Sequence, residues 1–389
     1  MAYMNERKNY LITTNMRKIL KFALCAACVM SMAACGGQTE ISSDKEETLQ
    51  RAMTPYVNNT VIATYSGMSD EGLVLLNLCE QILAAQEAGQ DYSALMTQAQ
   101  TSWRAMRKFW EQSEAFLYGP ASTHSIDPHI DSWPLDFNAM NALLNNAEQM
   151  AQIEEEGGAY VGDKLGYALK GFHAAEYLLF TKTTLTHPEA VYLVGIVEDL
   201  TQQAILLEYC WADEVSAAKQ ALLEEGDIEP WEDRYGWQMI NAGKPGSIFV
   251  TYQEAAEDIV AGCADIADEV AKLKMGNPYL SSTEEQREYI ESPYSYTSTI
   301  DFADNIRSIE HAYCGSLAGD YSISNYVSLQ DADLDSSVRQ AITDAIAAIE
   351  AIKNFETTAQ GNTQVKAAMD KVAALEEILS NEVLPLLSK

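Results

Sequence analysis

The chain has 389 residues, of which 57 are Asp or Glu and 25 are Lys or Arg, giving a formal net charge of −32. A nucleic-acid-binding protein needs clustered cations that displace phosphate counterions, so this acidic chain is excluded from that class. Hydrophobic residues make up 47% of the sequence, which excludes a disordered or collagen-like protein and provides enough apolar material for two domains or one large one.

The first 35 residues have the pattern of a secretory signal peptide. Arg17, Lys18 and Lys21 precede an apolar run at residues 22–32. This run is too short to cross about 30 Å of hydrocarbon as a helix, which favours a signal sequence over a membrane span. We therefore expect the protein to be exported to the cell envelope.

A cysteine follows this signal directly. The sequence Met32-Ala33-Ala34-Cys35 resembles a bacterial lipobox, in which the cysteine thiol accepts lipid. The alternative is ordinary cleavage after small residues, with Cys35 incidental. With lipid on Cys35, residues 36–48 would form a flexible polar stalk. Because the protein is acidic, its acyl chains would hold it at the lipid bilayer, on the periplasmic face or at the cell surface.

Apolar residues recur with a period of about 3.6 along almost all of the chain after residue 48, and no strong alternating strand pattern is present. The sequence therefore predicts an all-α fold of two helical-bundle halves packed together, at 49–224 and 248–389. A stretch rich in Gly, Pro and aromatic residues at 225–247 predicts a connecting loop, and a second irregular stretch at 276–296 is too long for a simple connector. Long helices are predicted at 50–88, 91–118, 136–153, 161–182, 188–211, 250–274, 299–316, 330–354 and 362–387.

The four cysteines after Cys35 lie in apolar helical stretches: Cys79, Cys210, Cys263 and Cys314. An oxidising envelope would permit disulfides, but no pair has the spacing of a metal site. We expect buried free thiols.

The predicted helix 91–118 carries charged residues on an aromatic stripe. In one interpretation, Glu114 is an inward-facing carboxylate beside Arg107. In the other, Arg107 pairs with Glu111 at i+4 on a solvated face, and Glu114 lies at its edge. The sequence does not choose between them. The residues of the stripe, at 4, 3, 4, 3 spacing, are Trp103, Arg107, Trp110, Glu114 and Leu117.

Two histidines, His124 and His129, follow this helix, and after them comes Trp133-Pro134-Leu135-Asp136. Asp136 can cap the next helix, while Trp133 is expected to pack against its neighbours.

The predicted helix 161–182 places a carboxylate in line with its apolar stripe. Glu176 should therefore point inward, and His173 lies three positions before it, within side-chain reach. A buried carboxylate needs a partner, which could be His173, a cation, a metal ion or a ligand. The alternative is a purely structural His–Glu pair. The residues of the stripe are Leu165, Leu169, Phe172, Glu176 and Leu179.

Further along the chain, Ser298-Thr299-Ile300-Asp301 fits a capping box. The apolar face of the helix that follows is formed by Phe302, Ile306, Ile309 and Tyr313.

Four segments together resemble the imelysin family, described as insulin-cleaving membrane proteases and their relatives. Residues 171–180 contain the G-x-H-x-x-E signature as Gly171, His173 and Glu176. The other three segments, in the family's order, are Trp103 to Gly119, Trp133-Pro134-Leu135-Asp136, and Ser295 to Gly315. The resemblance implies two helical-bundle halves, a functional cleft lined by this signature near their junction, and an association with bacterial iron uptake. By the same resemblance, Ser298, Asp301 and Asn305 would face the cleft.

These residues support a binding protein as the first hypothesis. His173 and Glu176 would hold a metal ion or a small polar ligand, Arg107 would fix an anionic group, and Trp133 would form an apolar wall. Imidazole and carboxylate donors suit Fe, Zn or Cu without choosing among them. Components of iron uptake would then be partners.

Two other hypotheses stay open. A metallopeptidase would use His173 and Glu176 as part of a metal site, but neither His-Glu-x-x-His nor His-x-x-Glu-His is present, because residue 177 is Tyr. Its third ligand would come from a distant residue, with Glu114, Asp136, His124 and His129 as candidates. The remaining hypothesis is a structural or interaction lipoprotein, which leaves an inward Glu176 unexplained.

Overall fold

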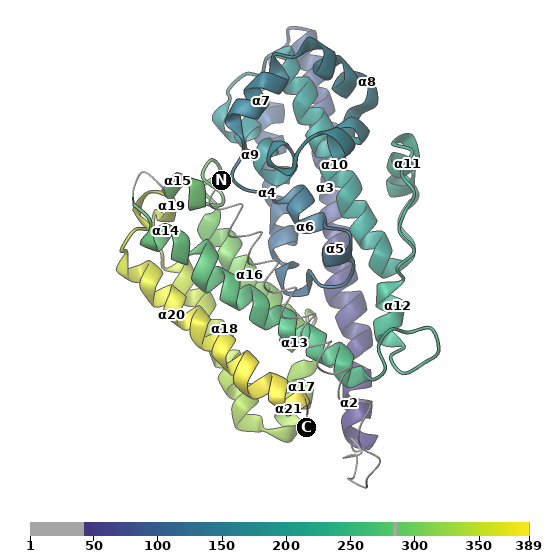
Figure 1. Ribbon diagram of the computed structural model, residues 1–389, viewed down its shortest axis with the longest axis vertical. Coiled ribbons are helices and arrows are strands. Elements are labelled where there is room, and N and C mark those ends of the chain that lie inside the picture. The colour runs from purple at the N-terminus through teal and green to yellow at the C-terminus, as the bar shows by residue number, and fades with distance from the viewer. Residues whose placement is uncertain (1–42, 283–285, 389) are drawn as a thin grey trace, which may run out of the picture. The chain divides into compact units, whose positions relative to one another are not determined.

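The computed structural model describes residues 43–282 and 286–388, and every regular element in these ranges is a helix (Figure 1). The predicted all-α fold is confirmed. The residues from Ser43 onward form one compact unit. The signal peptide, the lipidation of Cys35 and most of the stalk are predictions that fall outside the described residues.

The first bundle is built around α10 (His187–Ala212), which packs against α3 (Ala63–Glu87), α8 (Ala147–Lys164) and α9 (Gly171–Thr181). A fifth helix, α4 (Ser93–Glu111), packs on α3 and α9. By length and composition α10 could cross a membrane, but 83% of its most apolar window is buried inside the protein. It is the central helix of this bundle.

The second bundle consists of four helices in which α16 contacts α13 and α18, and α20 contacts the same two. These helices are α13 (Tyr252–Glu269), α16 (Ser298–Cys314), α18 (Ala332–Glu350) and α20 (Thr363–Ile378). They form the green and yellow part of Figure 1. Each buries its apolar stripe toward the others, as the sequence periodicity predicts.

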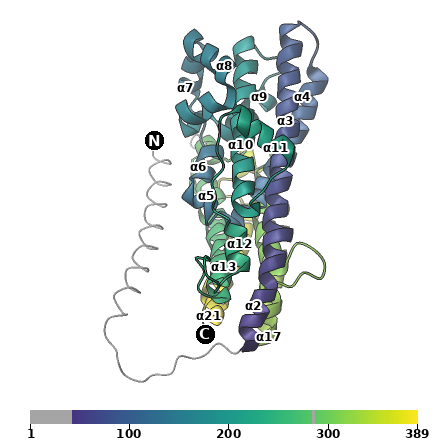
Figure 2. The same cartoon turned by 90° about the vertical axis from the view of Figure 1, so that its right-hand side faces the viewer.

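The first helix joins the two bundles. α2 (Ser43–Pro55), a π-helical turn η1 (Tyr56–Ile62) and α3 follow one another without a break and run along one line (Figure 2). α2 contacts α13 and α17 (Ile323–Gln330) of the second half, whereas α3 belongs to the first bundle. One continuous cluster of buried apolar side chains extends through both bundles.

Short helices and turns complete the described chain. They are η2 (Glu114–Phe116), α5 (Pro120–Thr123), α6 (Ile126–Ile130), α7 (Phe137–Leu144), η3 (Tyr167–Leu169), α11 (Ala217–Glu225), α12 (Tyr235–Ile240), η4 (Val270–Lys274), α14 (Gly276–Leu280), α15 (Gln286–Tyr289), α19 (Phe355–Thr358), η5 (Leu379–Val383) and α21 (Leu384–Leu387).

The predicted helix 161–182 is wrong in its first half, because α8 ends at Lys164 and α9 begins at Gly171. Gly171 has a φ of +75°, and a Cβ atom there would lie 2.0 Å from the carbonyl oxygen of Ile130. Only glycine fits both the left-handed backbone and this close approach. The glycine of the G-x-H-x-x-E signature therefore starts a new helix against the 126–130 segment.

The four described cysteines are free: Cys79, Cys210 and Cys263 are buried, and Cys314 is half-buried. This agrees with the expectation of free thiols.

Candidate functional site

A group of buried ionisable side chains lies where the two bundles meet. We call it the interbundle cluster. Its residues from the first half lie in α4, in η2, in the loop that follows α6, and in α9. The others lie in η4, in the segment before α16, and in α16 itself. Its members are Arg107, Glu111, Glu114, Asp131, His173, Glu176, Lys274, Glu291, Asp301 and Asn305.

Arg107 is the central cation of the cluster and is 1% exposed. Its Nη2 atom lies 2.6 Å from Glu111 Oε1 and 3.0 Å from Glu291 Oε1, and Nη1 pairs with Asp131. The predicted i+4 pair of Arg107 with Glu111 therefore forms, but the interpretation that placed it on a solvated face is wrong. Both side chains are buried, because this face of α4 is covered by the second bundle.

Asp131 connects Arg107 to the histidine. One of its oxygens, Oδ1, lies 3.0 Å from His173 Nε2, and the other accepts a 2.8 Å hydrogen bond from Trp110 Nε1. Burial alone would raise the pKa of Asp131, but Arg107 and His173 outweigh it and hold this pKa well below its ordinary value. Asp131 is therefore a carboxylate at neutral pH.

His173 lies between two acids. Its Nδ1 atom is 3.5 Å from Glu176 Oε2, on the opposite side of the ring from Asp131. Burial alone would lower the pKa of His173, but the close carboxyl groups of Asp131 and Glu176 outweigh burial and raise it to about 9. The ring of Trp133 lies 5.0 Å from the imidazole, which agrees with a role as an apolar wall.

Glu176 is 0% exposed, so its predicted inward orientation is confirmed. Its Oε1 atom accepts hydrogen bonds from the backbone N–H of Tyr294 at 3.1 Å, the backbone N–H of Ser295 at 2.8 Å and the Ser295 hydroxyl at 2.6 Å. The oxygen is thus fully used in holding a segment of the second half. Glu176 orients His173 and joins the bundles.

The second half supplies a lysine. Lys274 Nζ lies 3.1 Å from Glu114 Oε1, 3.0 Å from Glu291 Oε1 and 3.6 Å from Glu111 Oε2. Glu114 follows the end of α4, so it reaches this lysine from η2 rather than from the helix that the sequence predicted. Burial raises the pKa of Glu114 well above its ordinary value and that of Glu111 to about 7, despite the nearby cations.

The residues that the family resemblance pointed to in the second half lie beside these acids. Asp301 accepts hydrogen bonds from Ser292 Oγ at 2.6 Å and Thr297 Oγ1 at 3.1 Å, and burial together with Glu111 raises its pKa well above the ordinary value. Asn305 Nδ2 donates to Glu111 Oε2 at 2.5 Å. The Ser298 hydroxyl, also buried, accepts from the backbone N–H of Ser292 at 3.4 Å.

Three sequence candidates lie elsewhere. Asp136 is exposed and accepts from the backbone N–H of Ala139 at 2.9 Å, so it caps α7. His124 pairs with Asp233, and His129 pairs with Asp199.

Sequence reasoning missed Asp131, Lys274 and Glu291 as members of the cluster. Glu291 lies in the irregular stretch that the sequence had marked as too long for a simple connector. Asp131 lies two residues before Trp133, just outside the segment that the resemblance had indicated, and nothing in its spacing relates it to His173.

Unpartnered buried polar atoms concentrate in this cluster. Among the described residues, eight buried side-chain nitrogen or oxygen atoms make no hydrogen bond, and five of them belong here: Arg107 Nε, Glu111 Oε1, His173 Nε2, Glu291 Oε2 and Asn305 Oδ1. Two of the five, Glu111 Oε1 and His173 Nε2, lie at ion-pair distance from a neighbour but are not aligned for a hydrogen bond. A buried polar atom that is left without any partner carries a desolvation penalty of about 1–3 kcal/mol, so this concentration makes the cluster the candidate site.

The cluster also contains more acids than bases. Six carboxyl groups, at Glu111, Glu114, Asp131, Glu176, Glu291 and Asp301, face Arg107, Lys274 and His173. Oxygens of Glu111, Asp131 and Glu291 all lie within 4.8 Å of one another, a separation at which one ion can contact all three. Of these three acids, Asp131 is also the neighbour of His173, at 3.0 Å, so an imidazole nitrogen lies beside the carboxylate oxygens. Arg107 already contacts one oxygen of each of these three carboxyl groups, and Lys274 contacts Glu111 and Glu291 as well.

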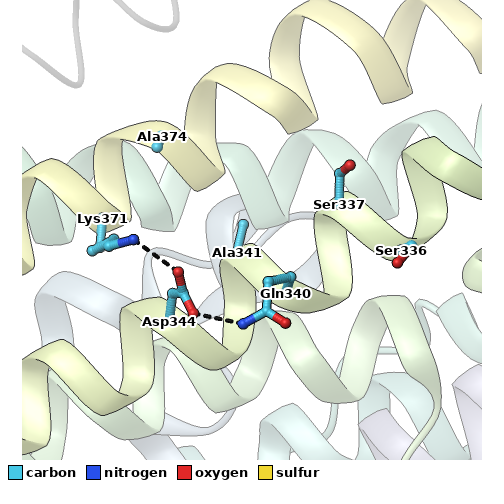
Figure 3. A pocket seen from close by; sticks show the side chains of 7 residues that line it. All are labelled: Ser336, Ser337, Gln340, Ala341, Asp344, Lys371 and Ala374. Carbon is cyan, nitrogen blue, oxygen red and sulfur yellow. Dashed lines mark hydrogen bonds and ion pairs between the residues drawn. The ribbon is translucent and has the colours of Figure 1, made fainter.

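A separate surface groove between α18 and α20 has a volume of about 460 Å³. In Figure 3, Gln340 and Lys371 point toward Asp344, at 2.6 Å and 2.8 Å. Small side chains form the rest of its wall, and none of its residues belongs to the interbundle cluster.

Comparison with known proteins gives consistent results. The family model described as Imelysin matches residues 61–381. Iron-regulated protein A of Synechococcus elongatus is 28% identical over 372 residues, which cover 93% of this chain and 92% of that protein.

Two crystal structures have a similar fold. One is a candidate iron-regulated protein A precursor from Parabacteroides distasonis, with a TM-score of 0.72 and 24% identity, covering 92% of this chain and 97% of the other. The second is an imelysin-like protein from Psychrobacter arcticum, with a TM-score of 0.64 and 12% identity. The match covers 92% of this chain and 98% of the other.

Proposed function

Because this chain belongs to the imelysin family, we propose that it is a cell-envelope lipoprotein that binds a metal ion or small polar ligand in the interbundle cluster, in a process linked to iron uptake. The observation that carries the proposal is the set of five buried polar atoms that make no hydrogen bond, among an excess of carboxyl groups. The name of the S. elongatus relative, iron-regulated protein A, supports the link to iron. The lipobox-like sequence ending at Cys35 supports the membrane anchor.

A metal ion is favoured over an organic ligand by the donor set. His173 Nε2, Asp131, Glu111 and Glu291 would hold the ion, and Glu176 would orient His173 through Nδ1, as carboxylates commonly do for metal-bound histidines. A divalent cation would offset the excess negative charge that burial makes costly.

Burial also separates this proposal from the peptidase alternative. His173 and Glu176 are 1% and 0% exposed, so a polypeptide substrate cannot reach them in this conformation. An ion needs far less space than a peptide. The proposed activity is therefore binding, with iron as the first candidate and zinc and copper as the others.

Calorimetric titration tests the proposal on the protein from Ser43 onward, which forms one compact unit. Fe(II), under anaerobic conditions, Zn(II) and Cu(II) are each added to the wild type and to the variants His173→Ala and Asp131→Asn. His129→Ala is the matched control, because His129 pairs with Asp199 away from the cluster.

We expect at least one of these ions to bind the wild type and the control, with binding weakened at least about tenfold in the two cluster variants. If the wild type binds none of them, or if His173→Ala binds every ion with the same affinity and the same number of sites as the control, the metal proposal fails. Unchanged helicity by circular dichroism shows that the variants remain folded.

A further inference from the structure

Three side chains of metal-binding types meet at a second place, made of residues outside the interbundle cluster. A ring nitrogen of His124, the sulfur of Cys210 and a carboxylate oxygen of Asp233 all lie within 4.8 Å of one another. His124 follows α5, Cys210 lies in α10, and Asp233 lies in the loop before α12. The fold therefore brings together residues as many as 109 positions apart.

The orientation of His124 is fixed from two sides. Its Nε2 atom lies 2.7 Å from Asp233 Oδ2, and its ring stacks on Trp231 with centroids 3.8 Å apart and planes 2° from parallel. The next residue, Ser125, has a left-handed backbone with a φ of 56°, which turns the chain directly after the histidine. The imidazole is thus held in place before any ion arrives, as a binding site requires.

The three donors lie at graded depths. Cys210 is 0% exposed, whereas the side chains of His124 and Asp233 are 17% and 29% exposed. The thiol is therefore at the bottom of the site and the other two groups are at its rim, where an ion from solvent can reach them. The nearby cation does not compete, because Arg234 donates to Asp213 at 3.2 Å.

The loop that carries Asp233 is also anchored. Gln238 Nε2 donates a 2.6 Å hydrogen bond to the backbone carbonyl of Asp233. Cys210 contacts the same loop through a weak hydrogen bond of 3.9 Å from its thiol to the carbonyl of Trp231. Both contacts hold the carboxylate beside the sulfur.

We propose that His124, Cys210 and Asp233 form a second metal site, which binds zinc or a similar divalent ion with water in the fourth position. Thiolate, imidazole and carboxylate are the three side-chain ligands of zinc in proteins, and three protein ligands with one open position are typical of its accessible sites. On binding, the thiol proton passes to solvent and a sulfur–metal bond forms, with no change of oxidation state.

A cysteine nucleophile is the competing explanation for this group. Burial and the neighbouring Asp233 raise the pKa of the Cys210 thiol, which disfavours the thiolate that such a nucleophile needs. A bound cation would reverse this effect, since coordination deprotonates a thiol. The convergence of three donors and the fixed orientation of His124 favour a metal site over a nucleophile.

Cobalt(II) is a suitable probe, because a cobalt–thiolate bond gives a charge-transfer absorption in the near ultraviolet that nitrogen and oxygen ligands do not give. Co(II) is titrated into the protein from Ser43 onward, which omits Cys25, Cys28 and Cys35. Zn(II) is then added to displace the cobalt. The variants are Cys210→Ser and Asp233→Asn, and the matched control is Cys79→Ser, which changes another buried cysteine of the first bundle.

We expect the absorption in the wild type and in Cys79→Ser, its loss in Cys210→Ser, and at least about tenfold weaker cobalt binding in Asp233→Asn. Absence of the absorption in the wild type, or its persistence in Cys210→Ser, would overturn the proposal. Asp233 is partly exposed, so Asp233→Asn tests the site even if Cys210→Ser does not fold. His173→Ala should keep the absorption, which distinguishes this site from the interbundle cluster.

Discussion

The backbone N–H of Ser295 donates a 2.8 Å hydrogen bond to Glu176, a residue 119 positions earlier in the chain. This bond joins α9 of the first bundle, which carries the G-x-H-x-x-E signature, to the segment that leads into α16 of the second bundle. The carboxylate of Glu176 is thus a structural connection between the bundles as well as the partner of His173.

Replacing Glu176 with Ala should lower the free energy of unfolding by about 3 kcal/mol, because it leaves the buried N–H groups of Tyr294 and Ser295 without an acceptor. Glu176→Gln keeps one acceptor oxygen and should cost less. Urea denaturation followed by circular dichroism measures both. Glu155→Ala, at an exposed position of α8, is the control and should change stability by less than about 0.5 kcal/mol. Equal effects at the two positions would contradict the assigned role.

Gly171→Ala should destabilise the protein by about 3 kcal/mol or more, since it combines a positive φ with a Cβ atom 2.0 Å from the Ile130 carbonyl oxygen. The matched control is Gly166→Ala, because Gly166 has a φ of −67° and no neighbouring atom within 4 Å of the added carbon. Thermal denaturation compares the two variants. A Gly171→Ala protein as stable as Gly166→Ala would show that α9 does not begin as described.

The free energy of unfolding of the metal-free protein should fall as the pH rises from 6.5 to 9. The folded state raises the pKa of His173 from 6.5 to about 9, so the folded protein binds a proton more tightly than the unfolded chain does. This contribution is fully present below pH 6.5, is lost as the pH passes 9, and amounts to at most about 3 kcal/mol.

Glu111, whose pKa is raised to about 7, also makes the free energy of unfolding fall as the pH rises, in a lower range between pH 4.5 and 7. Urea denaturation at several pH values, with a chelator present, gives the profile. His173→Gln should flatten the profile between pH 6.5 and 9 and leave the lower window unchanged. An equally steep upper window in that variant would assign the effect to another group.

Iron, if it is the bound ion, should stabilise the protein by about 2.7 kcal/mol when its free concentration is a hundred times its dissociation constant. The midpoint of thermal unfolding would then rise with Fe(II) and return to its original value when a chelator removes the ion. His173→Ala and Asp131→Asn should lack this rise, and His129→Ala should keep it. A rise of equal size in all variants would place the ion elsewhere.

Asp136→Ala should cost about 1 kcal/mol, the usual price of a lost N-cap, because the carboxylate bonds the Ala139 N–H at the start of α7. Metal affinity should not change, since Asp136 is exposed and outside the cluster. Scanning calorimetry measures the stability of this variant, and calorimetric titration measures its affinity for the metal ion. A loss of metal binding would return Asp136 to the set of ligand residues.

Helical periodicity alone predicted the all-α fold, because each helix buries one stripe against its neighbours. The break between α8 and α9 was missed because Leu165 and Leu169 continue the apolar spacing, although the chain is not helical at 165–166 and makes only a short turn at 167–169. What decides that break is Gly171 and its approach to Ile130, a contact between residues 41 positions apart that no local pattern records.

The inward position of Glu176 was predictable because this residue continues the apolar stripe of its helix. The residues around it were not predictable, since Asp131, Lys274 and Glu291 lie in irregular segments or at the ends of elements, where the sequence has no periodic pattern. Likewise, the pairing of Arg107 with Glu111 follows from helix geometry, whereas its burial depends on α16 covering that face of α4.

The apolar character of α10 has a consequence for how the protein is made. A segment of this length and hydropathy is at risk of aggregation or of being taken up as a membrane span while it is unpaired. Its main partners, α3, α8 and α9, all precede it in the chain. When synthesis reaches residue 212, the helices that cover α10 have therefore already been produced, so α10 can be buried against them as soon as it is complete.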